Sequence, residues 1–171
     1  MHPPWDVTTK ASMGKWAYPS DFLGKFHTWT FDLMLPSAGN SNGFPETWHA
    51  GTLFQDHTSF QSGHHLALDS VTFPSDRFRY GVWVGPGNNY EYQWSEQPIQ
   101  YDRWYRFKWE IKYSTGADGY VTMWMDGVQV VNHAGPSIEP NSGLAMQVGY
   151  YSAAQLTNEV RYGGVQYRRT G

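Results

Sequence analysis

The stretch that decides the fold reads WYRFKWEIKYSTGADGYVTMWMDGVQVV and spans residues 104–131. Its first part alternates strictly, with apolar or aromatic side chains at Tyr105, Phe107, Trp109, Ile111 and Tyr113. The residues between them are charged, namely Arg106, Lys108, Glu110 and Lys112. Successive side chains of a β-strand point to opposite faces, so this pattern predicts a strand with one apolar face and one largely cationic face.

Two reversals follow this strand. Residues 114–119 are polar and contain glycine, which predicts a turn, and residues 120–125 can return as a second strand. Asp126 and Gly127 form a residue pair typical of a two-residue hairpin, in which both positions need positive φ, and residues 128–131 then return. We therefore expect a three-stranded antiparallel meander. Its core residues should include Phe107, Trp109, Ile111 and Met123.

The rest of the chain reads as further short strands. Eighteen glycines and ten prolines punctuate it, and no window carries a convincing helical stripe. The expected strands are residues 26–35, 48–57, 65–71, 77–84, 90–94, 144–151 and 159–168. Roughly ten to twelve strands at this spacing predict a single all-β domain over residues 1–171, folded as an antiparallel two-sheet sandwich. Within the first 25 residues we expect a candidate strand at 5–13 and a loop at 13–25.

Composition and charge exclude several classes of function. The formal net charge is −3, so a nucleic-acid partner is not expected. The chain has no cysteine, hence no disulfide framework and no thiolate chemistry. No segment is long and apolar enough for a membrane span, and no apolar run follows the first four residues, so neither a membrane partner nor a signal peptide is expected. We expect an extracellular or otherwise exported domain, with an intracellular location left open.

Aromatic residues make up 18% of the chain, more than a core alone requires. Tyr90, Tyr92 and Trp94 share one face of an expected strand. They belong either to the core or to a platform for sugar rings, because aromatic faces suit the C–H faces of pyranoses. Arg77 and Arg79 also share a face, in the strand before them.

Three pieces of the sequence, in this order, resemble the jelly-roll polysaccharide lyases, the group of heparin lyase I, glucuronan lyase and alginate lyase. They are GTLFQDH at 51–57, similar to a Gln-x-His strand of those enzymes, the meander itself, and AMQVGYY at 145–151, similar to their Lys-x-Gly-x-Tyr strand. Together they cover roughly residues 26–168. The resemblance implies a concanavalin A-like β-jelly roll that cleaves a uronic-acid-containing glycan by β-elimination. We expect neither a cofactor nor a bound metal.

The resemblance also implies roles for individual residues. A lyase removes the proton α to a carboxylate and expels the 4-linked sugar, so it needs a donor to the carboxylate, a base and an acid. Gln55 would be the donor, His57 its partner or the base, and Tyr151 the acid, or both acid and base. Neighbouring cations would have to lower the tyrosine pKa from about 10. The expected substrate-binding residues are Arg77, Arg79, Tyr90, Tyr92, Trp94, Arg106, Lys108 and Lys112.

The sequence departs from this group in two places. Alginate-type lyases carry an Arg-x-Glu-Leu-Arg strand upstream of Gln-x-His, where this chain reads KASM with Lys10 as its cation. The lysine of the C-terminal motif is Gln147 here. Both changes remove groups that would bind an anion.

Less specific interpretations stay open beside this one. Gln55 and His57 could be polar residues of a solvent-facing strand, Tyr151 an ordinary aromatic like Tyr150, and the three cations of the meander a solvated sheet face. His64 and His65 are expected to be exposed loop residues, and nothing in the sequence fixes a metal geometry for them with His57. The competing functions are a lyase for an anionic polysaccharide, a non-catalytic carbohydrate-binding or adhesin module, and a structural sandwich in a larger assembly.

Overall fold

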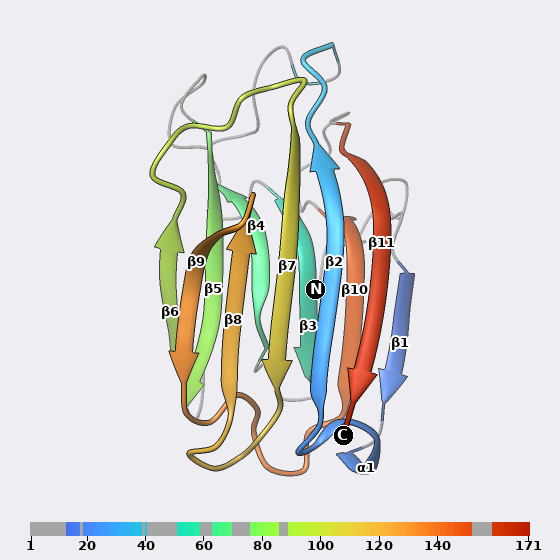
Figure 1. Ribbon diagram of the computed structural model, residues 1–171, viewed down its shortest axis with the longest axis vertical. Helices are drawn as coiled ribbons and strands as arrows, with labels where there is room; N and C mark the ends of the chain where they lie inside the picture. Colours follow the sequence, from blue (N-terminus) through green and yellow to red (C-terminus); the bar gives the residue numbers. More distant parts are fainter. Residues whose placement is uncertain are drawn as a thin grey trace, which may run out of the picture.

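The protein folds as a two-layer β-sandwich, and most of its described residues belong to strands (Figure 1). The computed structural model describes residues 13–17, 19–38, 40, 51–58, 63–69, 76–85, 89–151 and 159–171. The strands form two sheets, called A and B. All strand pairs are antiparallel. The prediction of an antiparallel two-sheet sandwich is therefore confirmed.

The strands follow one another along the chain with one short helix near the start. The elements are β1 (Met13–Ala17), α1 (Pro19–Phe22), β2 (Phe26–Met34), β3 (Gly51–Thr58), β4 (His65–Asp69), β5 (Arg77–Gly85), β6 (Asn89–Trp94), β7 (Trp104–Lys112), β8 (Tyr120–Met125), β9 (Val128–Ala134), β10 (Leu144–Tyr151) and β11 (Arg161–Thr170). Sheet A has the strand order β1-β10-β3-β4-β5-β6, and sheet B the order β11-β2-β7-β8-β9. None of the helices in the described part of the chain is long and apolar enough to cross a membrane.

The core lies between the two sheets and is centred on β7. Phe107, Trp109, Ile111 and Met123 are each fully buried, as predicted. The alternation of β7 explains this, because every second side chain of the strand is buried while those between reach the outer face of sheet B. Across the sandwich, the ring of Phe54 in sheet A lies with its centroid 4.7 Å from that of Trp109.

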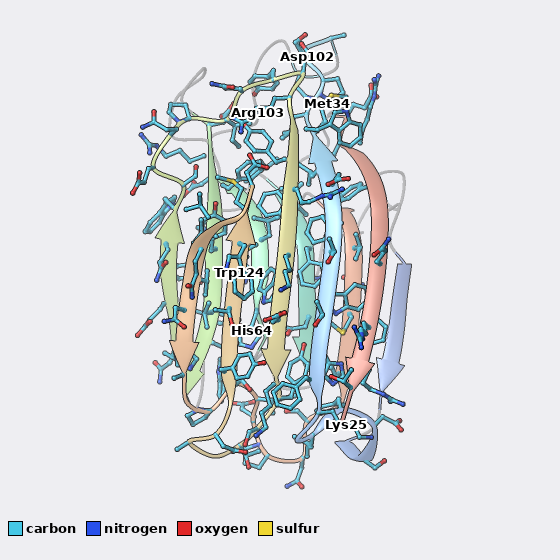
Figure 2. The ribbon with its side chains drawn as sticks, viewed as in Figure 1. Lys25, Met34, His64, Asp102, Arg103 and Trp124 are labelled. Atoms are coloured by element: carbon cyan, nitrogen blue, oxygen red, sulfur yellow. The ribbon has the colours of Figure 1, made fainter. Side chains whose placement is uncertain are left out.

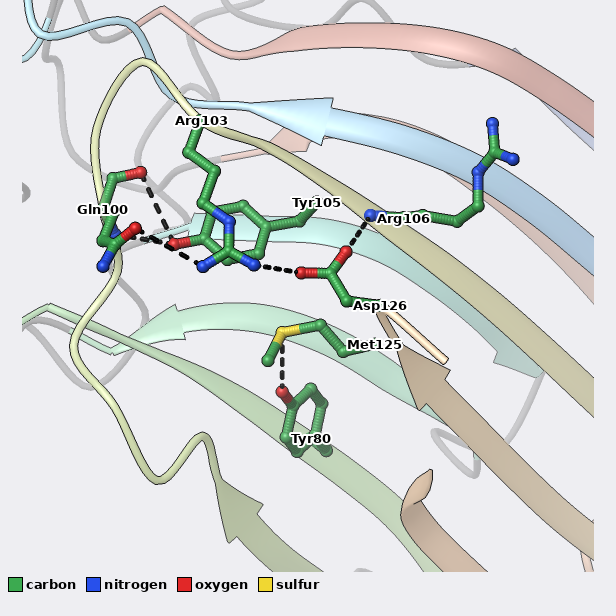
Figure 3. A network of polar contacts seen from close by, with 7 residues as sticks. All are labelled: Tyr80, Gln100, Arg103, Tyr105, Arg106, Met125 and Asp126. Atoms are coloured by element: carbon green, nitrogen blue, oxygen red, sulfur yellow. Dashed lines mark hydrogen bonds and ion pairs between the residues drawn. The ribbon is translucent and has the colours of Figure 1, made fainter. Parts of the chain in front are cut away.

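The hairpin between β8 and β9 has the backbone that its sequence predicts. Asp126 and Gly127 have φ angles of 52° and 81°. The Asp126 carboxylate also holds the start of β7, because it accepts hydrogen bonds from the Arg106 backbone N–H at 2.8 Å and from the Arg103 guanidinium at 2.6 Å (Figure 3). The turn is thereby tied to the strand on which the sheet is built.

The N-terminal segment differs from the sequence prediction. Residues 13–25 were expected to be a loop, and this is wrong: Met13–Ala17 forms β1, which pairs with β10, and Pro19–Phe22 forms α1. Pairing with a distant strand and burial of Phe22 stabilise a segment whose own sequence shows no clear pattern. The rest of the candidate strand at 5–13 lies outside the described residues.

We expect Trp109→Ala to lower the free energy of unfolding by about 3–5 kcal/mol, because it leaves a cavity in a fully packed core. Trp104→Ala is the matched control on the same strand, since Trp104 faces outward and is 49% exposed. It should cost about 1 kcal/mol or less. Urea denaturation of both variants measures the difference, and equal losses would contradict this description of the core.

Candidate active site

The outer face of sheet A carries a row of polar side chains at its centre. In the strand register Gln55 of β3 lies opposite Gln147 of β10 on one side and His65 of β4 on the other. Directly paired residues share a face of the sheet, so these three side chains stand side by side. The Gln55 amide Nε2 donates a hydrogen bond to Gln147 Oε1 at 2.5 Å. Gln147, in the position of the expected lysine, is thus a direct partner of Gln55.

The backbone places two further predicted site residues, His57 and Tyr151, on the same two strands. His57 lies two residues beyond Gln55 in β3, opposite Ala145 of β10. Tyr151 ends β10, opposite Thr52 of β3. The side chains of His57 and Tyr151 lie outside the described residues, so the prediction that they meet Gln55 stays a prediction.

The aromatic row of β6 lies on this same face. The centroids of Tyr90 and Tyr92 are 5.8 Å apart and those of Tyr92 and Trp94 are 6.4 Å apart, and Trp94 is 48% exposed. The interpretation of this row as core is therefore wrong. The reason is the register of β6 against β5. Tyr92 and Trp94 pair with Gly81 and Arg79, which lie on the outer side of β5. The residues of β6 that pair with the core-facing positions of β5 carry amide and carboxylate groups instead.

The two arginines of β5 are held in different ways. Arg79 is almost completely buried, and its guanidinium carbon lies 5.2 Å from the centroid of the Tyr92 ring. Arg77 Nη1 donates hydrogen bonds to the backbone carbonyls of Ser95 and Glu96, at 2.7 and 2.5 Å. Arg79 therefore brings positive charge beneath the aromatic row, while Arg77 fixes the end of β6.

The expectation that His64 and His65 are exposed loop residues is wrong. His64 is completely buried, and His65 begins β4 with its ring centroid 5.6 Å from that of Tyr90 and 5.8 Å from that of Tyr92. A Cβ at Gly81 would fall 2.3 Å from atoms of the His65 ring, so only glycine leaves the ring its space. This glycine, in the middle of β5, was the signal in the sequence. The described residues contain no group of histidines and carboxylates that could hold a metal ion.

The cations of the meander lie on the opposite side of the molecule. Arg106, Lys108 and Lys112 project from the outer face of sheet B, so the core separates them from Gln55. Each forms an ion pair: Arg106 with Asp32, Lys108 with Glu110, and Lys112 with Asp118, at 2.6–2.7 Å. The hydrogen bond from Lys112 lowers the pKa of Asp118 to about 2. Their role as substrate-binding residues stays a prediction. It would place substrate on the outer face of sheet B rather than on the face that carries Gln55.

A buried polar cluster supports β3 from beneath. Between Gln55 and His57, Asp56 points inward and accepts a hydrogen bond from the Tyr113 hydroxyl at 2.5 Å. Its other oxygen accepts the backbone N–H of His64. Because Tyr113 directly follows β7, this hydrogen bond joins the two sheets directly behind the Gln55 row. Burial, and secondarily the Asp56 charge, raises the pKa of Tyr113 well above its ordinary value, so the hydroxyl remains a donor.

The His64 ring is held in its neutral form. Nδ1 accepts the backbone N–H of Trp83 at 3.2 Å, so Nε2 carries the proton and donates to the carbonyl of Ser137 at 3.0 Å. Burial, the largest cause, lowers the pKa of His64 below its ordinary 6.5, although the Asp56 charge acts in the other direction. His27 is also buried, and desolvation lowers its pKa too.

These depressed pKa values predict a pH dependence of stability. Below about pH 6.5 the unfolded chain takes up protons that the folded histidines resist, so the free energy of unfolding should fall as the pH is lowered from about 7 to 5. Glutamine in His64→Gln can accept from Trp83 and donate to Ser137, and should reduce this slope. His27→Gln should reduce the remainder, while Asp32 and Asp118, whose pKa values are lowered by their cationic partners, titrate below this range. Denaturant titrations across this range provide the measurement, and a slope unchanged in both variants would rule out this origin.

Comparison with known proteins gives a family for the chain. A family model described as polysaccharide lyase matches residues 44–169. A search of curated protein sequences found no match. Similar solved structures include the endo-β-1,4-glucuronan lyase of the fungus Trichoderma reesei, with a TM-score of 0.61 and 16% identity over 85% of this chain and 68% of that one. They also include a mutant of alginate lyase Aly36B in complex with alginate trisaccharide, with a TM-score of 0.63 and 15% identity over 86% and 72% of the chains. At such identities the likeness shows a shared jelly-roll fold.

Proposed function

This chain belongs to the polysaccharide lyase family, and on that premise we propose that it cleaves a uronic-acid-containing glycan by β-elimination on the outer face of sheet A. The observation that carries the proposal is the amide row of Gln55 and Gln147, beside an exposed aromatic row on the same face. The glucuronan and alginate lyases with the same fold support a uronate polymer as the substrate.

The proposed reaction needs one group that stabilises the substrate carboxylate. Gln55 takes this role: one amide hydrogen is bound by Gln147, and the other can donate to a carboxylate oxygen. Negative charge grows on that carboxylate as the proton at C5 is removed, so a fixed donor there stabilises the transition state more than the bound substrate.

The remaining steps remove the proton from C5, expel the 4-linked oxygen and deliver a proton to it. The base takes the proton from C5, the C–H electrons form the C4–C5 double bond, the C4–O bond breaks, and the leaving oxygen receives a proton. In this proposal His57 is the base or the partner of Gln55, and Tyr151 is the acid, or both acid and base. Their backbone positions on β3 and β10 support this assignment, because these strands are direct neighbours.

The aromatic row extends the site along the sheet. Tyr92 and Trp94 can stack on pyranose rings, and the indole N–H of Trp94 already donates to Asp69 at 2.6 Å, which fixes the ring. The buried Arg79 beneath Tyr92 adds the positive potential that an anionic polymer needs. We assign Tyr90, Tyr92, Trp94 and Arg79 to substrate binding.

Tyr151→Phe separates catalysis from binding, because it removes only a hydroxyl. We expect the elimination rate to fall by about 10²–10⁴-fold, with little change in glycan affinity. The rate is followed by the absorbance of the unsaturated uronate product on alginate, glucuronan, heparin and pectate. Affinity electrophoresis measures binding, and Gln55→Ala should show the same separation.

A non-catalytic carbohydrate-binding module is the second candidate, favoured by the amide that stands in place of the expected lysine. In that case no polymer would yield the unsaturated product, yet the protein would be retained in the affinity gel. Trp94→Ala would then be the damaging change and Tyr151→Phe would be silent.

A further inference from the structure

The outer face of sheet B carries aromatic rings at a regular spacing along β7. Trp104 stands at the start of the strand, Trp124 of β8 pairs with Lys108, and Tyr120 pairs with Lys112. Phe26 of β2 also pairs with position 112, from the other side. Four residues of a strand span roughly 13 Å, so rings recur at about that interval over the length of the sheet. We call Trp104, Trp124, Tyr120 and Phe26 the ring line, and Figure 2 labels Trp124 about half-way along the sheet.

Two rings of this line are exposed, and the other two, Trp124 and Tyr120, are half-buried. Trp104 is 49% exposed, and its ring lies over β11, 3.5 Å from where a Cβ of Gly163 would stand. Phe26 is 39% exposed, and its centroid lies 5.9 Å from that of Tyr120. Single exposed aromatics are ordinary on protein surfaces, but a row at constant spacing on one face is a feature of a binding surface.

Charged groups in ion pairs stand between the rings. Arg106 binds Asp32 with both ends of its guanidinium, Nε to Oδ1 at 2.7 Å and Nη2 to Oδ2 at 2.9 Å. Lys108 lies 4.7 Å from the centroid of Trp124 and pairs with Glu110. Because these cations already have carboxylate partners, the surface is not a bare anion site. It offers hydroxyl-binding acceptors and donors next to stacking rings, which is the chemistry that holds a pyranose.

We propose that the ring line is a second polysaccharide-binding surface, on the face opposite the candidate active site. A linear polymer lies along β7, with sugar rings on Trp104 and Trp124 and hydroxyl groups on the Arg106–Asp32 pair. The choice of a uronate polymer as ligand rests on the proposed function. Such a surface keeps the protein on its polymer and raises the local concentration of cleavable segments at sheet A.

The test is affinity electrophoresis in gels that contain alginate or glucuronan. The double variant Trp104→Ala/Trp124→Ala should weaken retention roughly 2- to 10-fold. Val128→Ala is the matched control, because Val128 is 66% exposed on the same sheet but off the ring line, and it should leave retention unchanged. Tyr92→Ala/Trp94→Ala reports separately on the sheet A face. The ring-line contribution should persist at about 1 M salt, where charges are screened beyond ~3 Å.

Retention of the double variant equal to that of wild type overturns the proposal, as does an equal loss in Val128→Ala or no retention of any form. Size-exclusion chromatography adds one more outcome: a dimer broken by the double variant would mean that the ring line binds a second copy of the chain, which also overturns it. Retention in the gel measures binding, whereas formation of the unsaturated product measures cleavage, so the two results can be compared. If the wild type forms no unsaturated product but the double variant is retained less, the proposed function is refuted and the second surface is supported. If the wild type cleaves the polymer and the double variant is retained as well as the wild type, the proposed function stands and the second surface is refuted.

Discussion

The structure depends on the two-faced pattern of β7. Its inward side chains fill the space between the sheets, and a shift of the strand by one residue would bury the charges of Arg106 and Lys108 in their place. Burial of the apolar side chains therefore determines the register of β7 against β2 and β8. Once that register is set, every outward position on sheet B is determined, including the rings that recur beside the cations.

A second constraint joins the sheets behind the candidate active site. The Tyr113 hydroxyl reaches across the core to Asp56, and the same carboxylate binds the His64 backbone. A buried carboxylate without donors would be strongly destabilising, so these two hydrogen bonds make the position of β3 specific. Gln55 directly precedes Asp56 in β3, and its own side chain lies on the other side of the strand.

The two outer faces of the sandwich differ in chemistry. Sheet A presents amides, a histidine and an aromatic row over a buried arginine, a combination suited to a carboxylate sugar. Sheet B presents ion-paired side chains between aromatic rings, suited to hydroxyl groups and pyranose faces. The exchange of the family lysine for Gln147 changes the first face most, because Gln147 binds the residue proposed to hold the substrate carboxylate.

The sequence alone determined the local structure and the family. Strict alternation predicted β7, the Asp126-Gly127 pair predicted its hairpin, and three ordered motifs indicated a polysaccharide lyase. Tertiary structure alone decided that Tyr92 and Trp94 lie outside, that His64 is buried, that residues 13–17 form a strand, and that Lys108 is far from Gln55. The reason is that a period of two assigns side chains to two faces, but only pairing between distant strands decides which face meets the core. Amphipathic residues such as tyrosine, tryptophan and histidine suit either side, so their own sequence cannot choose.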